Sequence, residues 1–141
     1  AKTFCVGNVN KEKKDLITIT KDCLYKGISE VKEGNTIGDI GYAIQTYAEQ
    51  NGYSVVRELV GHGIGQNLHE EPQVPNFGHR NSGPIIEVGL CLAIEPMINC
   101  GVKEVFTKED SWTVCTKDGK PSAHFEHSIA FTDKGVKILT K

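Results

Sequence analysis

The sequence predicts a single α+β domain in which helices precede a run of mainly antiparallel strands. Amphipathic helical stretches occupy the first third of the chain, and short β-branched runs separated by Gly, Pro and Asn follow from Tyr53 onward. Helices and strands that are segregated along the chain in this way are typical of an α+β fold and not of a doubly wound sheet. Because a length of 141 residues fits one domain of ordinary size, residues 1–141 are expected to form one domain.

Two helices are expected, over residues 11–31 and 37–50. In the first, apolar side chains recur every three to five residues, close to the helical period, and Gly34 follows its end. Before the second, Thr36 is a candidate N-cap and Asp39 stands three residues later, which is the spacing of a capping box. The helical part of the fold is therefore predicted from local signals alone.

The remaining elements are short strands and one long loop. Residues 61–87 are rich in Gly, Pro, His and Asn, and we expect a long loop there. A long loop inside a compact domain is usually functional, and its spaced histidines favour function. The candidate strands cover residues 90–94, 102–106, 112–115, 124–131 and 136–139.

Composition excludes several classes of protein. The chain has 16 Lys and Arg against 18 Asp and Glu, which argues against a broadly basic nucleic-acid binder. No apolar run is long enough for a membrane-spanning helix. The five cysteines contain no Cys-x-x-Cys pair, so we expect free, mostly buried thiols in a reducing compartment, the cytoplasm. The chain opens at Ala1 on what reads as a strand already under way, as expected for a processed chain or a fragment.

Spaced His and Glu residues are the candidate metal ligands. His62 lies between two glycines, which would let the backbone turn tightly and let a ligand approach, and His69 follows it. Glu95 and Glu126 are each embedded in an apolar run, where a carboxylate is costly unless it is paired or coordinated. One imidazole with two carboxylates suits a divalent metal such as Mn, Fe(II), Co or Zn, and two carboxylates can bridge a pair of metals.

Four segments carry a resemblance to a known family. They read Gly-His-Gly-Ile-Gly at 61–65, His-Glu-Glu-Pro-Gln-Val at 69–74, Ile-Glu-Pro-Met-Ile-Asn at 94–99 and Phe-Glu-His-Ser at 125–128. Together they resemble the type I methionine aminopeptidases, and the similarity covers essentially all of the chain. The resemblance implies the pita-bread fold, in which helices pack on a curved, mainly antiparallel sheet. It also implies hydrolytic removal of the initiator methionine from new polypeptides at a site with two divalent metal ions.

The resemblance implies a role for each candidate residue. His62 matches the histidine ligand, Glu95 a terminal carboxylate ligand that also accepts the proton of the attacking water, and Glu126 the bridging carboxylate. His69 matches the histidine that contacts the substrate peptide and steadies the tetrahedral intermediate. Trp112 matches a wall of the methionine side-chain pocket. The metal ligands are thus expected to be one imidazole and two carboxylates, with His69 and Glu95 as the catalytic residues.

The chain departs from the family at several positions. Leu68 stands where the family commonly has an aromatic residue of the substrate pocket, so this pocket is expected to differ in shape. His124 stands where the family often has Gln, and it offers an extra polar contact near the metals. The two aspartate ligands of the family fall in a segment that would precede Ala1. The chain is therefore expected to be an incomplete, C-terminal portion of the catalytic domain, with little or no activity by itself.

Two other functions remain open on the same fold. One is an X-Pro aminopeptidase or dipeptidase, which shares the His and Glu pattern. The other is a non-catalytic pita-bread binding protein. For the favoured function, the resemblance implies peptide substrates with an N-terminal methionine, the ribosome as a partner, and a cytoplasmic monomer without nucleic-acid specificity or membrane association.

Overall fold

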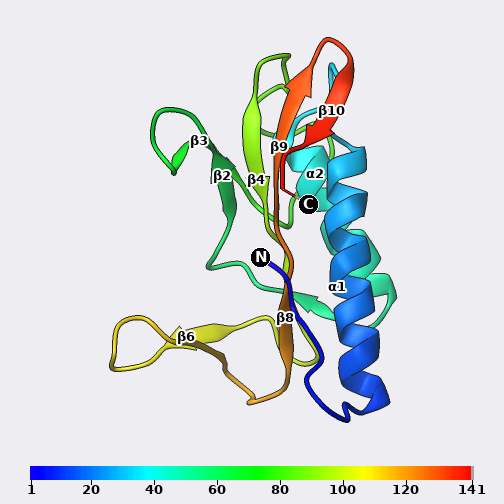
Figure 1. The fold of residues 1–141 in the computed structure, drawn as a ribbon, viewed down its shortest axis with the longest axis vertical. Helices are drawn as coiled ribbons and strands as arrows, with labels where there is room; N and C mark the ends of the chain where they lie inside the picture. Colours follow the sequence, from blue (N-terminus) through cyan, green and yellow to red (C-terminus); the bar gives the residue numbers. More distant parts are fainter. Residues whose placement is uncertain (141) are drawn as a thin grey trace.

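A computed structural model describes residues 1–140 and shows two helices packed on one face of antiparallel sheets (Figure 1). Helix α1 spans Lys11–Ser29 and helix α2 spans Ile37–Gln50. At the start of α2, the backbone N–H of Thr36 donates to the Asp39 carboxylate at 2.8 Å, as the predicted capping box requires. Within residues 1–140, neither helix is long and apolar enough to cross a membrane.

Ten short strands form three sheets within the described residues, and every pairing is antiparallel. The strands are β1 Ser54–Val55, β2 Gly61–Gly63, β3 Glu70–Val74, β4 Cys91–Ile94, β5 Met97–Asn99, β6 Val105–Thr107, β7 Val114–Thr116, β8 Ser122–His124, β9 His127–Thr132 and β10 Gly135–Ile138. The largest sheet has the order β10-β9-β4-β2-β3, and a second has the order β1-β5-β8. Strands β6 and β7 form a hairpin that extends away from the helices (Figure 1).

The predicted α+β class is confirmed, and several strand predictions are corrected. The expectation of a long loop over 61–87 is wrong for its first part, because this part contains β2 and β3. The strand expected over 124–131 is interrupted between β8 and β9. Strands β1 and β5 were not predicted, because two or three residues are too few to show a period-two pattern.

The core lies between the helices and the strands. Ile40 and Ile44 of α2 are fully buried, as are Leu92 and Ile94 of β4, and all four belong to one hydrophobic cluster. Because side chains alternate along a strand, Ala93 and Glu95 project to the face of the sheet opposite to that of Leu92 and Ile94. The helices therefore fix one face of β4 as apolar and leave the other face for polar side chains.

Candidate metal centre

Glu95 and Glu126 lie at facing interruptions in two long antiparallel strands. Strand β4 continues into β5 through Glu95 and Pro96, and β8 continues into β9 through Phe125 and Glu126. Pro96 has no N–H group, so the ladder of hydrogen bonds cannot pass through it unbroken. One bond remains at the interruption, from the N–H of Phe125 to the carbonyl of Pro96 at 3.3 Å.

The strand register places the two glutamates opposite each other. Ile94 pairs with His127 before the interruption, and Met97 pairs with His124 after it. Because the register is the same on both sides, the intervening glutamates are cross-strand neighbours. Like charges directly opposite each other destabilise a sheet. A cation held between the carboxylates removes this repulsion.

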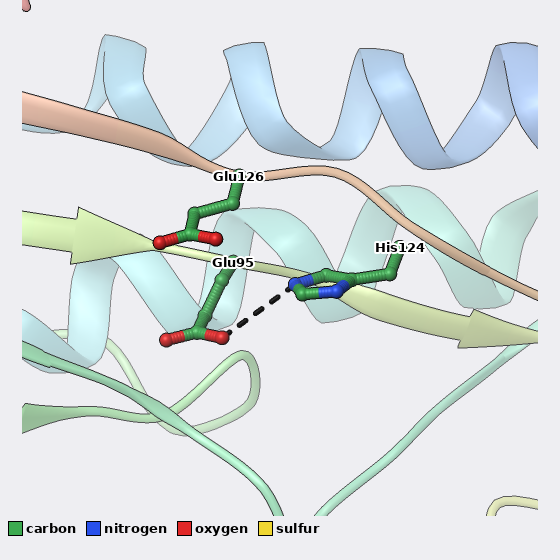
Figure 2. Close-up of side chains that lie close together, drawn as sticks. All are labelled: Glu95, His124 and Glu126. Atoms are coloured by element: carbon green, nitrogen blue, oxygen red, sulfur yellow. Dashed lines mark ion pairs between the residues drawn. The ribbon is translucent and has the colours of Figure 1, made fainter. Parts of the chain in front are cut away.

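Three side chains gather their potential ligand atoms at the two facing strand interruptions, at residues 95–96 and 125–126, which we call the bend (Figure 2). A carboxylate oxygen of Glu95, a carboxylate oxygen of Glu126 and a ring nitrogen of His124 all lie within 4.8 Å of one another. The ring of His124 points toward Glu95, and its Nε2 atom lies 3.5 Å from Glu95 Oε2. That Nε2 atom is buried and has no hydrogen-bond partner within residues 1–140.

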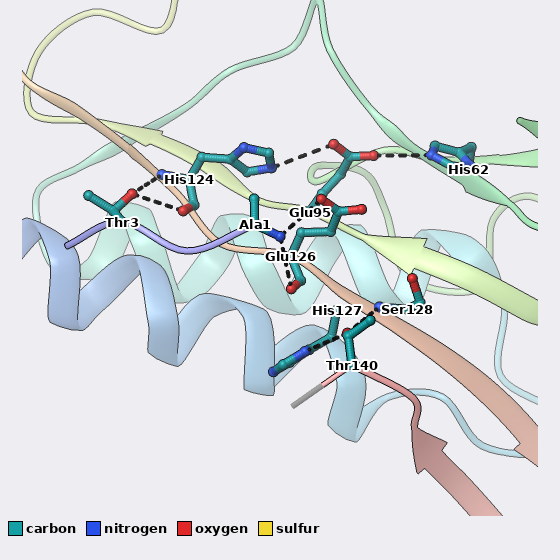
Figure 3. A network of polar contacts seen from close by, with 9 residues as sticks. All are labelled: Ala1, Thr3, His62, Glu95, His124, Glu126, His127, Ser128 and Thr140. Atoms are coloured by element: carbon teal, nitrogen blue, oxygen red, sulfur yellow. Dashed lines mark hydrogen bonds and ion pairs between the residues drawn. The ribbon is translucent and has the colours of Figure 1, made fainter. Parts of the chain in front are cut away.

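His62 reaches the same carboxylate from the other side (Figure 3). It lies in β2 opposite Ala93 of β4, and its Nε2 atom is 3.6 Å from Glu95 Oε1. Its Nδ1 atom is 2.9 Å from the carbonyl oxygen of Gly63. When Nδ1 donates its hydrogen to that carbonyl, Nε2 is left with a lone pair that faces the carboxylate. This second hydrogen bond is the usual way in which a metal-binding histidine is oriented.

The glycines beside His62 are required by strand packing. A Cβ atom at Gly61 would overlap the carbonyl oxygen of Ala93, and one at Gly63 would overlap that of Glu71. Strand β2 therefore fits between β3 and β4 only without side chains at these two positions. The register also shifts between His62 and Gly63, as in a β-bulge, which changes the direction of the neighbouring side chains. The structure thus gives a packing reason for these glycines and places them in a strand, where a tight turn was expected.

Asn76 contacts the backbone of Glu95, and the sequence analysis did not identify this residue. Its side chain is fully buried, and Nδ2 donates to the carbonyl oxygen of Glu95 at 3.2 Å. The segment that carries Asn76 packs closely on α2, because a Cβ atom at Gly41 would overlap the carbonyl oxygen of Phe77. A single Asn after Val-Pro carries no local signal for this long-range contact.

The charges around the bend fit a divalent cation. Within residues 1–140, the ion pairs of the two glutamates involve only His62, His124 and the amino group of Ala1, which is 3.1 Å from Glu126 Oε2. Among side chains of the described residues, the two carboxylates therefore meet two imidazoles, and no Lys or Arg pairs with either of them. Carboxylate and imidazole donors together suit Zn, Mn, Co or Fe(II), so the residues that are present fit a metal of this class.

The other predicted site residues lie in different surroundings. The ring of His69 packs against that of His62, with centroids 4.2 Å apart and a tilt of 51°. Leu68 lies between β2 and β3 and is 71% exposed, and Trp112 lies in the β6–β7 hairpin and is 86% exposed. The described residues thus bring His69 to the candidate centre, whereas Leu68 and Trp112 are not enclosed in a pocket. Their part in substrate binding stays a prediction.

Paired helices on antiparallel sheets, with His and Glu side chains gathered where two strands are interrupted, agree with the pita-bread metallopeptidase fold that the resemblance implies. Comparison with family profiles agrees: residues 1–133 match metallopeptidase family M24, and the chain belongs to this family. The family is one of peptidases that use divalent metal ions. The predicted family and fold are therefore confirmed.

Within the family, the chain is similar to methionine aminopeptidases. It is 52% identical over 139 residues to methionine aminopeptidase 1 of Bacillus subtilis, and the match covers 99% of this chain and 56% of the relative. The crystal structure of methionine aminopeptidase from Rickettsia prowazekii superposes with a TM-score of 0.96 at 45% identity, covering 99% of this chain and 57% of that one. The chain thus spans about half the length of the relatives that it matches.

Prolidases share the fold at a lower level of similarity. The prolidase from Pyrococcus horikoshii superposes with a TM-score of 0.75 at 23% identity, covering 99% of this chain and 35% of that chain. At this identity the likeness concerns the fold alone. The comparison therefore favours the methionine aminopeptidases over the X-Pro enzymes as the model for function.

Proposed function

We propose that this chain provides the C-terminal part of the catalytic domain of a metal-dependent aminopeptidase that removes N-terminal methionine from polypeptides. The observation that carries the proposal is the pair of facing glutamates, Glu95 and Glu126, with an imidazole on either side of Glu95. The similarity to methionine aminopeptidases across nearly the whole chain supports this choice of substrate.

Each polar residue of the centre has a role in this proposal. A pair of divalent ions, of Co, Mn, Fe(II) or Zn, supplies polarisation of the peptide carbonyl and a more acidic water. His62, Glu95 and Glu126 would hold the ions. Glu95 also accepts the proton of the attacking water and returns it to the leaving amine. His69 donates a hydrogen bond to the negative charge that develops on the substrate oxygen.

Specificity is proposed to come from residues at the edge of the site. Leu68 and Trp112 contribute to a pocket for the flexible thioether side chain of methionine. Because both are largely exposed in the described chain, we expect substrate or a further segment of protein to cover them. Leucine is smaller and more flexible than the aromatic residue that the family commonly has here, so the pocket is expected to be wider at this wall.

The cellular setting follows from the same proposal. We infer a cytoplasmic monomer that acts on new polypeptides with an N-terminal methionine, near the ribosome. The state of the cysteines supports a reducing compartment, because none of the five is paired within the described residues. Only Cys23 is buried, and three others are partly exposed, so the expectation of mostly buried thiols is wrong.

The test is hydrolysis of a peptide panel, with Met-Ala-Ser and X-Pro peptides as substrates and a chelator as the control. We would assay the 141-residue chain and a chimera in which the preceding part of the Bacillus subtilis relative is joined to Ala1. The chain alone is expected to have little or no activity, because the aspartate ligands implied by the family match no residue in it. The chimera is expected to cleave Met-Ala-Ser and to lose this activity with the chelator.

Two variants of the chimera test the role of the bend. Glu126→Ala removes a proposed metal ligand and is expected to abolish most activity. Glu70→Ala removes an acceptor for the N–H of Asn67 at 2.7 Å, which orders the loop before β3, and is expected to cost far less. Equal losses, or faster cleavage of the X-Pro peptides, would contradict the proposal.

A further inference from the structure

We propose that His124 is a metal ligand of this centre, so that imidazole nitrogens bind on both sides of the Glu95 carboxylate. This inference rests on the proposed metal-dependent function. It concerns a residue that departs from the Gln often found at this position in the methionine aminopeptidases that the sequence resembles. With His124 included, the chain offers four side chains as potential metal ligands, two carboxylates and two imidazoles.

The position of His124 is fixed by its backbone. Its N–H donates to Thr3 Oγ1 at 3.0 Å, and the Thr3 hydroxyl donates to its carbonyl oxygen at 2.9 Å (Figure 3). The residue also ends β8, where it pairs with Met97 of β5. The strand and Thr3 therefore fix the backbone from which the His124 side chain extends toward Glu95.

The Nε2 atom of His124 has the surroundings of a ligand atom. It is buried, it lies 3.5 Å from Glu95 Oε2, and no hydrogen bond connects it to any described residue. A buried polar nitrogen without a partner costs free energy. A ring nitrogen of His124 also lies within 4.8 Å of carboxylate oxygens from both glutamates. A cation bound among these three atoms satisfies the nitrogen and separates the two negative charges.

The second imidazole changes which metals the centre prefers. Zn²⁺ and Co²⁺ bind well to imidazole, whereas Mn²⁺ suits oxygen donors better. A glutamine at position 124 offers only an amide oxygen as a donor. We therefore expect His124→Gln to weaken Zn²⁺ binding by about tenfold or more and to leave Mn²⁺ binding within about twofold.

The test measures metal binding by the full 141-residue chain and does not depend on catalysis. Zn²⁺ affinity is measured by competition with a chromophoric chelator, Mn²⁺ affinity by electron paramagnetic resonance, and Co²⁺ coordination by visible absorption. The variants are His124→Gln, Glu126→Gln and the control His79→Gln, which alters an exposed histidine outside the centre. We expect His124→Gln to change the Co²⁺ spectrum and to weaken Zn²⁺ binding, while His79→Gln changes neither.

A second measurement needs no substitution. In long-range ¹⁵N–¹H spectra of the unaltered chain, the ring nitrogens of His124 should shift when Zn²⁺ is added, and those of His79 should not. Unmoved His124 signals, with Zn²⁺ binding that Glu126→Gln abolishes, would overturn the role of His124 and leave the metal centre standing. Failure of both the unaltered chain and the chimera to bind Zn²⁺ or Co²⁺ would overturn both.

Discussion

Replacement of Gly61 by alanine should damage the fold and the candidate metal centre together. The added Cβ atom would overlap the carbonyl oxygen of Ala93, which belongs to the neighbouring strand β4. Strand β2 is held on both sides, with Gly61 opposite Val74 of β3 and His62 opposite Ala93 of β4, so it cannot move away from one neighbour without pressing on the other. The overlap must therefore be relieved by separating β2 from β4.

The size of the effect follows from two contributions. Overpacking of a tightly packed interior costs about 1–3 kcal/mol, and loss of one ladder hydrogen bond costs about 1 kcal/mol. We expect the free energy of unfolding to fall by about 2–4 kcal/mol. Separation of β2 from β4 also moves His62 away from Glu95, so Zn²⁺ affinity should fall by about tenfold or more.

The assay combines urea denaturation with the Zn²⁺ competition measurement. Gly34→Ala is the matched control, because Gly34 has φ +82° with nothing within 4 Å of an added Cβ atom. A side chain in this left-handed conformation costs about 1–2 kcal/mol, while the metal centre is untouched. Gly34→Ala should therefore lose stability and keep its Zn²⁺ affinity. A Gly61→Ala variant with unchanged stability, or equal loss of Zn²⁺ affinity in both variants, would refute the packing argument.

Three further predictions concern buried side chains. Asn76→Asp removes the side-chain donor to the Glu95 carbonyl and should weaken Zn²⁺ binding. Asn99 is equally buried, and its side chain donates to the carbonyl of Val102, so Asn99→Asp is the control. This control should lower the stability measured in urea and leave Zn²⁺ binding unchanged. Burial acts to raise the pKa of Asp39, but hydrogen bonds from Thr36 and Asn81 and the charge of Arg80 together lower it more, so its net pKa is lowered. The stability that this carboxylate contributes is thus present at neutral pH and is lost below about pH 4, and Asp39→Asn should flatten the acid branch of a stability–pH curve. Burial raises the pKa of the Cys23 thiol to about 12, so peptide mapping after brief alkylation should find exposed Cys5 modified and Cys23 intact, and equal labelling in the folded chain would contradict this.

The helices could be predicted from the sequence because their signals are local. The apolar period of α1 and the Thr36–Asp39 capping box are complete within a few consecutive residues, and both helices lie close to the expected ranges. Strands β1 and β5 could not be predicted, since two or three residues show no period. Strand β2 was not predicted, because glycine is rare in strands and the close approach of β3 and β4 requires glycine at positions 61 and 63.

The candidate site was predictable in its composition and not in its arrangement. Glu95 and Glu126 could be predicted as candidate metal ligands, because carboxylates within apolar runs need a charged or polar partner. Their direct opposition depends on the register between distant strands, which no local pattern encodes. For the same reason, His124 could be noted only as a departure from relatives, and the contact of Asn76 with the Glu95 carbonyl could not be foreseen at all.

Anomalous X-ray scattering from crystals of the chain grown with Zn²⁺ tests most directly whether the imidazoles and the facing glutamates share a cation. We expect an anomalous peak at the bend, about 2.0–2.2 Å from carboxylate oxygens of Glu95 and Glu126 and from an imidazole nitrogen. Crystals in which Zn²⁺ binds only at other residues, with the two carboxylates turned away from each other, would contradict the account.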